Sequence, residues 1–304
     1  MNRSVKRFFL LACLLLASFN VSSAIYVVHD DEESAVRSLT FQLSKLLPTD
    51  VPIIPIRRLL LMQNVSQLEK NDLVVTVGAD SFRQLCSIPL KSAMVAVFIG
   101  QEEYLNIQPR CSVPSSAVFS GAPLEKRLTL LNAIWFDRKP LSVIYSDSLF
   151  IDEVRMQRQA AQYGFEFQFL KTATDRLSVL RSINFVLEDS TIIFSLVDTE
   201  LYKNGNAQDI LRLLFHKRQI IIGPSLAFVQ AGSLFAVYSD TSTKLSALAG
   251  HIMLWNKEKR LPAPSYPDLL RVSFNPYLIK FHGVVLPSPA FLKEKYGLCS
   301  EKMC

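Results

Sequence analysis

The stretch "QIIIGPSLAFVQAGSLFAVYSD", residues 219–240, decides the fold class. Its apolar run Gln219–Ile222 predicts a strand that is buried on both faces. The Gly-Pro-Ser turn at 223–225 predicts that the chain then passes from strand into a short helix. A second strand is predicted at Leu234–Tyr238. The stretch therefore indicates an α/β fold, and it raises the question of what Ser225 does on the turn.

The same alternation of strands and helices extends along the chain. Candidate strands are Ile25–Val28, Val51–Ile56, Leu73–Val77, Met94–Phe98, Leu141–Tyr145, Glu166–Leu170, Thr191–Val197, Gln219–Ile222 and Leu234–Tyr238. Candidate helices are Glu33–Leu47, Ser81–Cys86, Leu124–Trp135, Asp152–Tyr163, Asp175–Leu187, Ala207–Lys217 and Ser242–Asn256. This order predicts parallel sheets with helices on both faces. The strands are too many for one sheet, so we expect two Rossmann-like lobes whose strand ends face a shared cleft.

The N-terminus reads as a secretory signal peptide over residues 1–24. Basic residues precede an apolar run at 8–17, and small residues follow at 22–24. A lipid-attachment site at Cys13 is the less favoured alternative, because the apolar run continues beyond it. No later run has the length of a membrane span. We therefore expect export to the periplasm.

Composition excludes several classes of function. Removing the signal peptide changes 33 basic and 27 acidic residues to 30 and 27, a formal charge of +3, which is too mild for a nucleic-acid-binding protein. No glycine-rich phosphate loop is present, and the four histidines are scattered, so we expect neither a cofactor nor a metal. Four cysteines remain after export, which permits two disulfides, and Cys299 and Cys304 are close enough to form one.

Ser225 has an enzymatic and a structural interpretation. A serine on a sharp strand-to-helix turn resembles a nucleophile elbow, and Asp240 or Asp268 and then His251 or His282 follow in the order of a triad. The match is weak, because little parallel sheet follows the turn and an alanine replaces the usual second glycine. We favour a helix cap whose hydroxyl faces the cleft, and we expect no enzyme.

Similar polar turns end other strands, at 77–81 and 145–148, which is how a pocket for a polar head group is built. For Phe119, Tyr145 and Tyr238, packing in the core or hinge is slightly favoured over solute contact. For Asp198, pairing with a solute amine and capping of the next helix are equally favoured. The predicted solute-binding residues are Asp80, Ser81, Gly100, Gln101, Phe119, Ser120, Tyr145, Ser146, Ser148, Asp198, Pro224, Ser225 and Tyr238.

From about residue 115 to 287 the order of motifs resembles the bacterial ABC-transporter substrate-binding proteins, in the group whose better-known members bind aromatic and other amino acids. The motifs are "GAPLEKRLTLLNAI" before "LSVIYS", then "IIIGPSLAFVQAGSLFAVYSD", "ALAGHIMLW" and "RLPAPSYPDLLRVSFNPYLIKFHGVVLP". The resemblance implies a type I periplasmic binding protein, with two lobes that are joined by three crossings and close by a hinge. It implies one lobe over 25–118 plus 239–262 and the other over 119–238 plus 263–304.

The resemblance also implies partners. They are a small solute, an amino acid or similar, and a membrane permease, and we expect a monomer. The predicted function is capture of a small polar or amphipathic solute between the lobes for an ABC-type uptake system. One alternative is a sensor or adaptor of the same fold that serves a signalling partner or an outer-membrane receptor. A third, less favoured hypothesis is a serine hydrolase built on Ser225.

Overall fold

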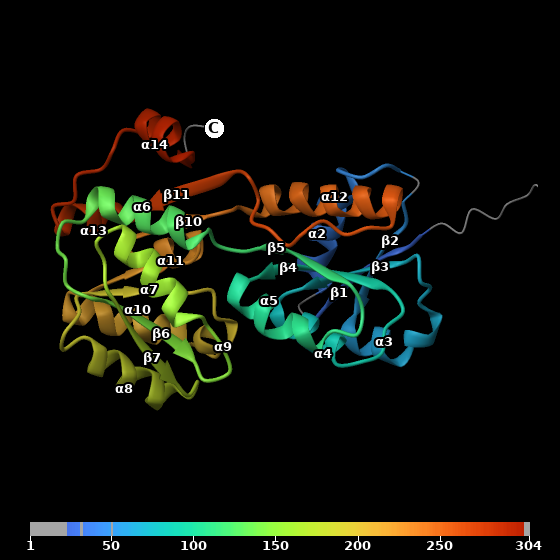
Figure 1. The fold of residues 1–304 in the computed structure, drawn as a ribbon, viewed down its shortest axis with the longest axis horizontal. Helices are drawn as coiled ribbons and strands as arrows, with labels where there is room; N and C mark the ends of the chain where they lie inside the picture. Colours follow the sequence, from blue (N-terminus) through green and yellow to red (C-terminus); the bar gives the residue numbers. More distant parts are fainter. Residues whose placement is uncertain (1–22, 31–32, 50, 301–304) are drawn as a thin grey trace, which may run out of the picture.

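A computed structural model describes residues 23–30, 33–49 and 51–300. The predicted signal peptide up to residue 22, with Cys13, lies outside the described residues, as does Cys304 of the predicted Cys299–Cys304 pair. Within the described ranges the chain forms two lobes, each built around a β-sheet with helices on its faces (Figure 1). In this part of the chain, no helix combines the length and the apolar character needed to cross a bilayer.

Lobe 1 contains a five-stranded sheet of order β2-β1-β3-β4-β5 in which all neighbouring strands are parallel. The strands are β1 (Ile25–His29), β2 (Ile53–Arg57), β3 (Leu73–Val77), β4 (Ala93–Ile99) and β5 (Ser115–Phe119). The helices are α2 (Glu33–Ser44), α3 (Arg58–Gln63), α4 (Ala79–Cys86), α5 (Gln101–Ile107) and α12 (Thr241–Glu258), with short 3₁₀ turns at Val65–Gln67 and Gln108–Arg110.

The continuous apolar runs of this sheet are explained by burial on both faces. Val75 and Val95 pack on one side with Leu248 of α12, whereas Val74 and Met94 pack on the other side with α4 and α5. Because α12 comes after the strands of lobe 2, the chain returns to lobe 1 to complete its core. Sequence periodicity predicted most of these elements but missed α3, α5 and β5.

Lobe 2 contains a parallel sheet of order β7-β6-β8-β9 and, beside it, strands in the order β10-β11-β12. The strands are β6 (Leu141–Ser146), β7 (Phe167–Thr172), β8 (Ile192–Phe194), β9 (Ile220–Ile222), β10 (Phe235–Tyr238), β11 (Leu270–Phe274) and β12 (Leu298–Ser300). A bridge between Gly223 and Ala236 joins β9 to β10. The helices are α6 (Leu124–Ile134), α7 (Glu153–Gln162), α8 (Arg176–Val186), α9 (Thr199–Tyr202), α10 (Asn206–Lys217), α11 (Leu226–Ala231), α13 (Pro276–Phe281) and α14 (Pro289–Tyr296).

The two larger sheets are parallel as predicted, and the pair β10 and β11 is antiparallel. The reason lies in the connections. After β10 the chain leaves for lobe 1, forms α12 and comes back, so β11 enters lobe 2 from the side at which β10 left it (Figure 1).

Three segments connect the lobes: one after β5, one after β10 and one after α12. The first and third run side by side. The backbone N–H of Phe119 donates to the carbonyl of Ser265 at 2.9 Å, and the N–H of Ser265 donates to Ala117 at 3.0 Å. These crossings are the hinge of the molecule, and they fix the ends of the strands of both lobes next to each other.

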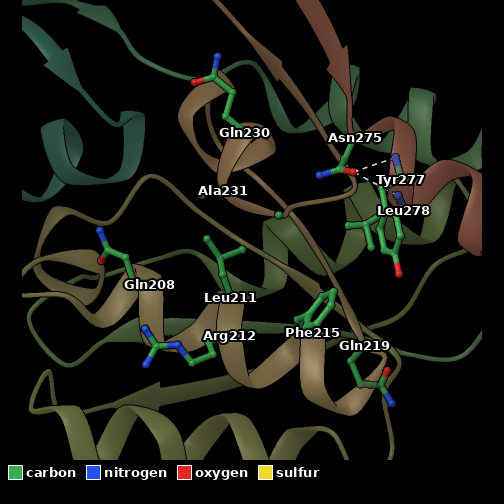
Figure 2. Close-up of a pocket in the computed structure, with 11 residues that line it drawn as sticks. Gln208, Leu211, Arg212, Phe215, Gln219, Gln230, Ala231, Asn275, Tyr277 and Leu278 are labelled. Carbon is green, nitrogen blue, oxygen red and sulfur yellow. Dashed lines mark hydrogen bonds between the residues drawn. The ribbon is translucent and has the colours of Figure 1, made fainter.

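A groove lies on the outer surface of lobe 2, between α10, α11 and the start of α13 (Figure 2). Its volume is about 400 Å³. Exposed rings of Phe215 and Tyr277 line it. Asn275 lines it as well, and its side-chain oxygen caps α13 by accepting hydrogen bonds from the backbone N–H groups of Tyr277 and Leu278, both at 3.1 Å. This lobe 2 groove is formed without lobe 1.

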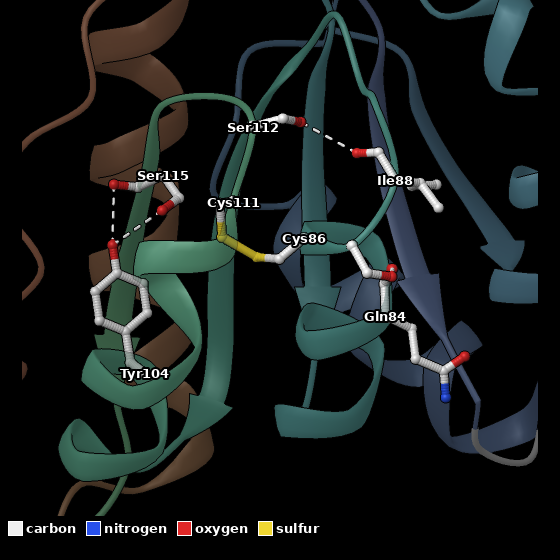
Figure 3. Close-up of a disulfide and its surroundings, with 8 residues drawn as sticks. Gln84, Cys86, Ile88, Tyr104, Cys111, Ser112 and Ser115 are labelled. Atoms are coloured by element: carbon white, nitrogen blue, oxygen red, sulfur yellow. Dashed lines mark hydrogen bonds between the residues drawn. A yellow bond between two sulfur atoms is a disulfide. The ribbon is translucent and has the colours of Figure 1, made fainter. Parts of the chain in front are cut away.

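A disulfide joins Cys86, at the end of α4, to Cys111, which precedes β5 (Figure 3). It closes a loop of 25 residues that contains β4 and α5. Nearby, the hydroxyl of Tyr104 donates to the carbonyl of Ser115 at 3.0 Å. The number of cysteines alone did not identify the partner of Cys86. The disulfide links the end of α4 to the segment before β5, at the edge of the lobe 1 sheet.

Candidate functional site

The two lobes touch where the strands of their sheets end. Gly100 follows β4 of lobe 1, and Val197 follows β8 of lobe 2. A Cβ atom on Gly100 would lie 2.8 Å from the carbonyl oxygen of Val197, a distance at which only glycine is tolerated without movement. The lobes are therefore in direct contact, as in a closed binding protein.

The carboxylate of Glu103 spans this contact. One oxygen accepts a hydrogen bond from the N–H of Gly100 at 2.8 Å, and the other accepts from the N–H of Thr199, in lobe 2, at 2.7 Å. Thr199 opens α9, so the carboxylate lies at a helix N-terminus, where negative charge is favoured. Burial raises the pKa of Glu103, against the lowering effect of the two backbone donors.

Two further contacts cross between the lobes. The Asn106 side chain of α5 donates to the carbonyl of Ser148 at 3.0 Å. Arg83 of α4 lies 3.5 Å from Glu200 of α9, and it also pairs with Asp80 at 2.5 Å. The charged pairs are partly exposed, so each contributes at most about 1 kcal/mol. The buried contact of Glu103 is the more important one.

An outer pocket of about 430 Å³ opens at the carboxyl ends of β1, β3 and β4. It is the size of a small-molecule site and lies where open α/β sheets bind ligands. Its lining residues are Asp30, Leu39, Val77, Gly78, Ala79, Asp80 and Phe98 of lobe 1 and Thr199 of lobe 2. Residues of both lobes thus border it.

The acidic groups of the outer pocket already have partners. Asp30 accepts from Arg58 Nε at 2.6 Å and from the Ser81 hydroxyl at 2.7 Å. Asp80 pairs with Arg83. These interactions fix the carboxylates in place. A solute in the outer pocket would therefore meet polar atoms at its rim that are already paired, and no unpaired charge.

Deeper in the interface lies an inner chamber of about 20 Å³, enough for roughly one water molecule. Its lining residues are Glu102 of α5, Tyr266 of the third crossing, and Gly121, Ala122, Leu124, Arg127, Met156, Leu196, Val197 and Pro224 of lobe 2. Apart from Glu102, Arg127 and the Tyr266 hydroxyl, the side chains are apolar. An amino acid does not fit until the lobes part.

The charges of the inner chamber sit in a desolvated environment. Burial lowers the pKa of Arg127 to about 10, so the guanidinium stays charged at neutral pH. Burial raises the pKa of Glu102, with Arg155 and Arg127 acting in the opposite direction. The pKa of Tyr266 is raised by burial and then by Glu102. The chamber therefore holds a permanent cation beside a carboxyl group whose ionised form is disfavoured.

Several residues that the sequence placed in the site are buried and bonded to the protein. Asp198 accepts hydrogen bonds from the N–H and hydroxyl of Ser146 at 2.7 and 3.0 Å, and from the N–H of Leu201 at 3.1 Å. It is therefore the N-cap of α9, the alternative that the sequence had left equal with amine binding. Burial raises the pKa of Asp198, although the hydrogen bond from the Ser146 N–H opposes this.

The predicted aromatic positions are all buried in the lobes. Phe119 packs edge-on against Tyr104 and Tyr266, with ring centroids 5.7 and 5.1 Å apart. The Tyr145 hydroxyl donates to Glu153 at 2.5 Å, and burial together with this bond raises the pKa of Tyr145 to about 12. Tyr238 lies in a small cluster with Val229. Packing, the slightly favoured alternative, describes these three side chains in the closed form.

The remaining predicted residues lie around the lobe contact. Gln101 accepts from the Tyr266 hydroxyl at 3.4 Å, and Pro224 lines the inner chamber. The Ser120 N–H donates to the carbonyl of Ile99 at 2.8 Å, and the Ser148 hydroxyl lies 3.1 Å from that of Ser146. The structure thus brings Gly100, Gln101, Ser148 and Pro224 to the interface, with Asp80 in the outer pocket.

Ser225 begins α11 in an extended conformation, but its side chain makes no capping hydrogen bond. In the described part of the chain, no hydrogen bond joins Ser225 to an aspartate or a histidine. Asp240 instead caps α12 and binds Arg271 at 2.5 Å, and His251 lies within α12. Ser225 is therefore the N-cap residue, as predicted, and its hydroxyl makes no hydrogen bond to the start of α11.

Three charged residues of the site were missed by the sequence analysis: Glu102, Glu103 and Arg127. The position of Arg127 in the sequence does point to a special role. It lies three residues after Leu124 and four before Leu131, and so falls on the apolar face of α6, where a charged residue is unexpected. The two glutamates open α5, a helix whose existence was not predicted.

Comparison with known proteins identifies the architecture. No protein-family model and no curated protein matches the sequence. Among solved structures, the chain is similar to the ABC domain in complex with L-Trp from Streptococcus pneumonia, with 15% identity over 90% of this chain and 99% of that one and a TM-score of 0.66. The fold is that of a type I periplasmic binding protein. Two further solved structures also match over most of their length and most of this chain.

A substrate-binding protein with adhesive properties from Clostridium difficile, in its ligand-free, open form, matches with 11% identity, 93% and 100% coverage and a TM-score of 0.62. A periplasmic ribose ABC transporter protein from Conexibacter woesei matches with 9% identity, 86% and 96% coverage and a TM-score of 0.51. The type I binding-protein fold and its two lobes, expected from the motif order, are thereby confirmed. At these identities the similarity concerns the fold.

Proposed function

We propose that this protein captures a small polar or amphipathic solute between its two lobes and presents the closed form to an ABC-type permease. The observation that carries the proposal is the convergence of strand ends from both lobes on the outer pocket and the inner chamber. A solute that contacts both lobes favours the closed state over the open one, which is how such a protein signals occupancy.

The lobe 2 groove is a poorer candidate for this role. Its lining comes from α10, α11 and α13 alone, so a solute bound there would contact one lobe and would not stabilise closure. The interlobe spaces therefore remain the site of the proposal.

Two features support export to the periplasm. The first 24 residues have the pattern of a signal peptide, and the Cys86–Cys111 disulfide suits an oxidising compartment. N-terminal sequencing of the protein recovered from the periplasm tests this part of the proposal. We expect the mature chain to begin at Ile25, and retention of residues 1–24 would contradict it.

The proposal for the solute follows from the lining, in which apolar side chains surround a few charged groups. An amino acid or a similar amphipathic molecule suits such a site better than a fully polar sugar. Structures of similar fold include one in complex with L-Trp and others that hold D-allose and myo-inositol. Both solute classes therefore belong in the test.

Thermal unfolding of the purified protein tests the proposal. The panel is L-tryptophan, L-phenylalanine, L-leucine, L-glutamate, D-ribose, D-allose and myo-inositol. A solute that binds only the folded protein adds roughly 2.7 kcal/mol of stability at 100 times its Kd, which raises the melting temperature in a concentration-dependent way. A melting temperature that no member of the panel changes contradicts capture of these solute classes.

A sensor or adaptor with the same fold is the alternative. The solute site would be the same, but the closed form would be read by a signalling protein or an outer-membrane receptor. Affinity capture from solubilised membranes with the solute-loaded protein separates the two. Recovery of a permease supports uptake, and recovery of a receptor or sensor kinase instead supports the alternative.

A further inference from the structure

Arg127 is a buried cation for which the protein supplies little compensation. Its side chain is 5% exposed, and its Nε–H has no hydrogen-bond partner. No carboxylate of the described residues lies within salt-bridge distance of it. An unpaired buried charge costs several kcal/mol, and a chain retains it where the charge has a task.

The guanidinium is held in a fixed orientation. One terminal nitrogen donates to the carbonyl of Ile222 at 3.3 Å, and the guanidinium carbon lies 4.1 Å from the ring centroid of Phe194. Both partners belong to the ends of lobe 2 strands, β9 and β8. The group is thus pinned on one side by the lobe 2 core, while Arg127 lines the inner chamber.

The surroundings of Arg127 favour an anion. Arg155 is a second cation close enough to act on Glu102 and Tyr266, and its Nε is also buried without a partner. Glu102 is the acidic residue in the lining of the chamber, and burial disfavours its ionised form. Leu124, Met156 and Leu196 supply an apolar wall next to the guanidinium.

We propose that Arg127 binds the carboxylate of an amphipathic solute, whose apolar part packs against Met156 and Leu196. The inference rests on the proposed function, because the solute reaches the chamber only when the lobes part. A guanidinium can bind a carboxylate with two parallel N–H donors, and the Nε–H of Arg127 has no partner within the described residues. The bound carboxylate supplies the hydrogen-bond partner that the Nε–H of Arg127 lacks within the described residues.

Matched pairs of solutes and one variant test the proposal. Calorimetry measures binding of L-tryptophan, L-phenylalanine, L-leucine and indole-3-acetate and of their primary amides, together with D-allose and myo-inositol as neutral solutes. The variant is Arg127→Met, which keeps an unbranched apolar stem and removes the guanidinium with its charge. Arg212→Met, at an exposed arginine of the same lobe, is the control.

We expect the acids to bind and their amides to bind at least tenfold more weakly. Arg127→Met should weaken the acids by about ten- to hundredfold, because a hydrogen bond to a charged group is lost. Its unliganded melting temperature should equal or exceed that of the parent protein, since the uncompensated charge is gone. Arg212→Met should bind as the parent does.

The outcomes separate this inference from the proposed function. Amides or neutral solutes that bind as tightly as the acids, or acids that bind Arg127→Met unchanged, overturn the role of Arg127 and leave solute capture intact. Absence of binding by every member of the panel overturns both. A large fall in the melting temperature of unliganded Arg127→Met assigns the residue to packing and also overturns the inference.

Discussion

A carboxylate oxygen of Glu103 in lobe 1 accepts a hydrogen bond from the backbone N–H of Thr199 in lobe 2, at 2.7 Å. The other oxygen of the same carboxylate accepts from the N–H of Gly100, the residue whose backbone lies against Val197 of lobe 2. One side chain therefore couples the end of β4 to the start of α9.

Glu103→Gln should shift the unliganded protein, an equilibrium of open and closed forms, further towards the open form. A glutamine has one acceptor oxygen, so either Gly100 or Thr199 loses its partner, at a cost of about 1–3 kcal/mol. Small-angle scattering should then show a larger radius of gyration than for the parent protein. Glu188→Gln, at an exposed position of lobe 2, should leave the radius unchanged. Equal radii for Glu103→Gln and the parent would show that this contact does not hold the lobes.

Gly100→Ala should disfavour closure by a steric route. The added Cβ would meet the Val197 carbonyl at 2.8 Å, and a backbone atom cannot rotate away as a side chain can. Solute affinity should fall while the lobes themselves stay folded. Gly250→Ala is the matched control, because nothing lies within 4 Å of its added Cβ and alanine suits the interior of α12. A Gly100→Ala protein that binds solute as tightly as the control contradicts the closed contact.

Removal of the Cys86–Cys111 disulfide should destabilise lobe 1. Closing a loop of 25 residues constrains the unfolded chain, and the expected loss in the double variant Cys86→Ser/Cys111→Ser is about 3 kcal/mol. Urea unfolding measures it, with reductant added to the parent protein as a second arm. The idea fails if the double variant and the oxidised parent unfold at the same urea concentration.

The titration of Lys244 should make the free energy of unfolding depend on pH in the alkaline range. Its ammonium group is buried, donates to the carbonyl of Ser239 at 2.6 Å and lies 5.2 Å from the Phe98 ring centroid. Burial lowers the pKa of Lys244 to about 8. In the unfolded chain lysine titrates near pH 10.4, so between about pH 8 and 10.4 the unfolded state binds more protons and folding stability rises with pH.

Lys244→Met lacks this titration and serves as the reference. The free energy of unfolding of the variant should exceed that of the parent most at pH 7, and the difference should shrink by up to roughly 3 kcal/mol as the pH approaches 10. Comparing the two proteins at each pH removes the contribution of the tyrosines. A difference that stays constant from pH 7 to pH 10 rules out the titration of Lys244.

The sequence predicted the lobes because their strands are buried on both faces. Runs such as Leu73–Val77 and Ile220–Ile222 are typical of strands in sheets covered on both faces, and such runs are too many for one sheet. The antiparallel pairing of β10 and β11 escaped prediction, because strand direction depends on the route of the chain through α12 and back. The periodicity of a sequence indicates that a segment is a strand, but it does not indicate the direction in which the strand enters the sheet.

The site was predicted less completely. A polar residue at a strand end can bind a solute or bond to the protein itself, and local sequence does not separate these two roles. Asp198 and Ser146 were correctly placed at strand ends, yet they bond to each other. The contact of Glu103 across the lobes is made with Thr199, which is 96 residues away, so no local sequence pattern could have predicted it. Arg127 was visible in principle, since a charged residue on the apolar face of α6 contradicts the pattern around it.

The most direct test of the account measures the distance between the lobes with and without solute. Spin labels at Ser66→Cys in lobe 1 and Arg181→Cys in lobe 2, both exposed, report this distance by pulsed electron paramagnetic resonance. A solute that raises the melting temperature should convert a broad distribution into a single narrow one at the closed distance. A distance distribution that such a solute leaves unchanged would contradict capture between the lobes.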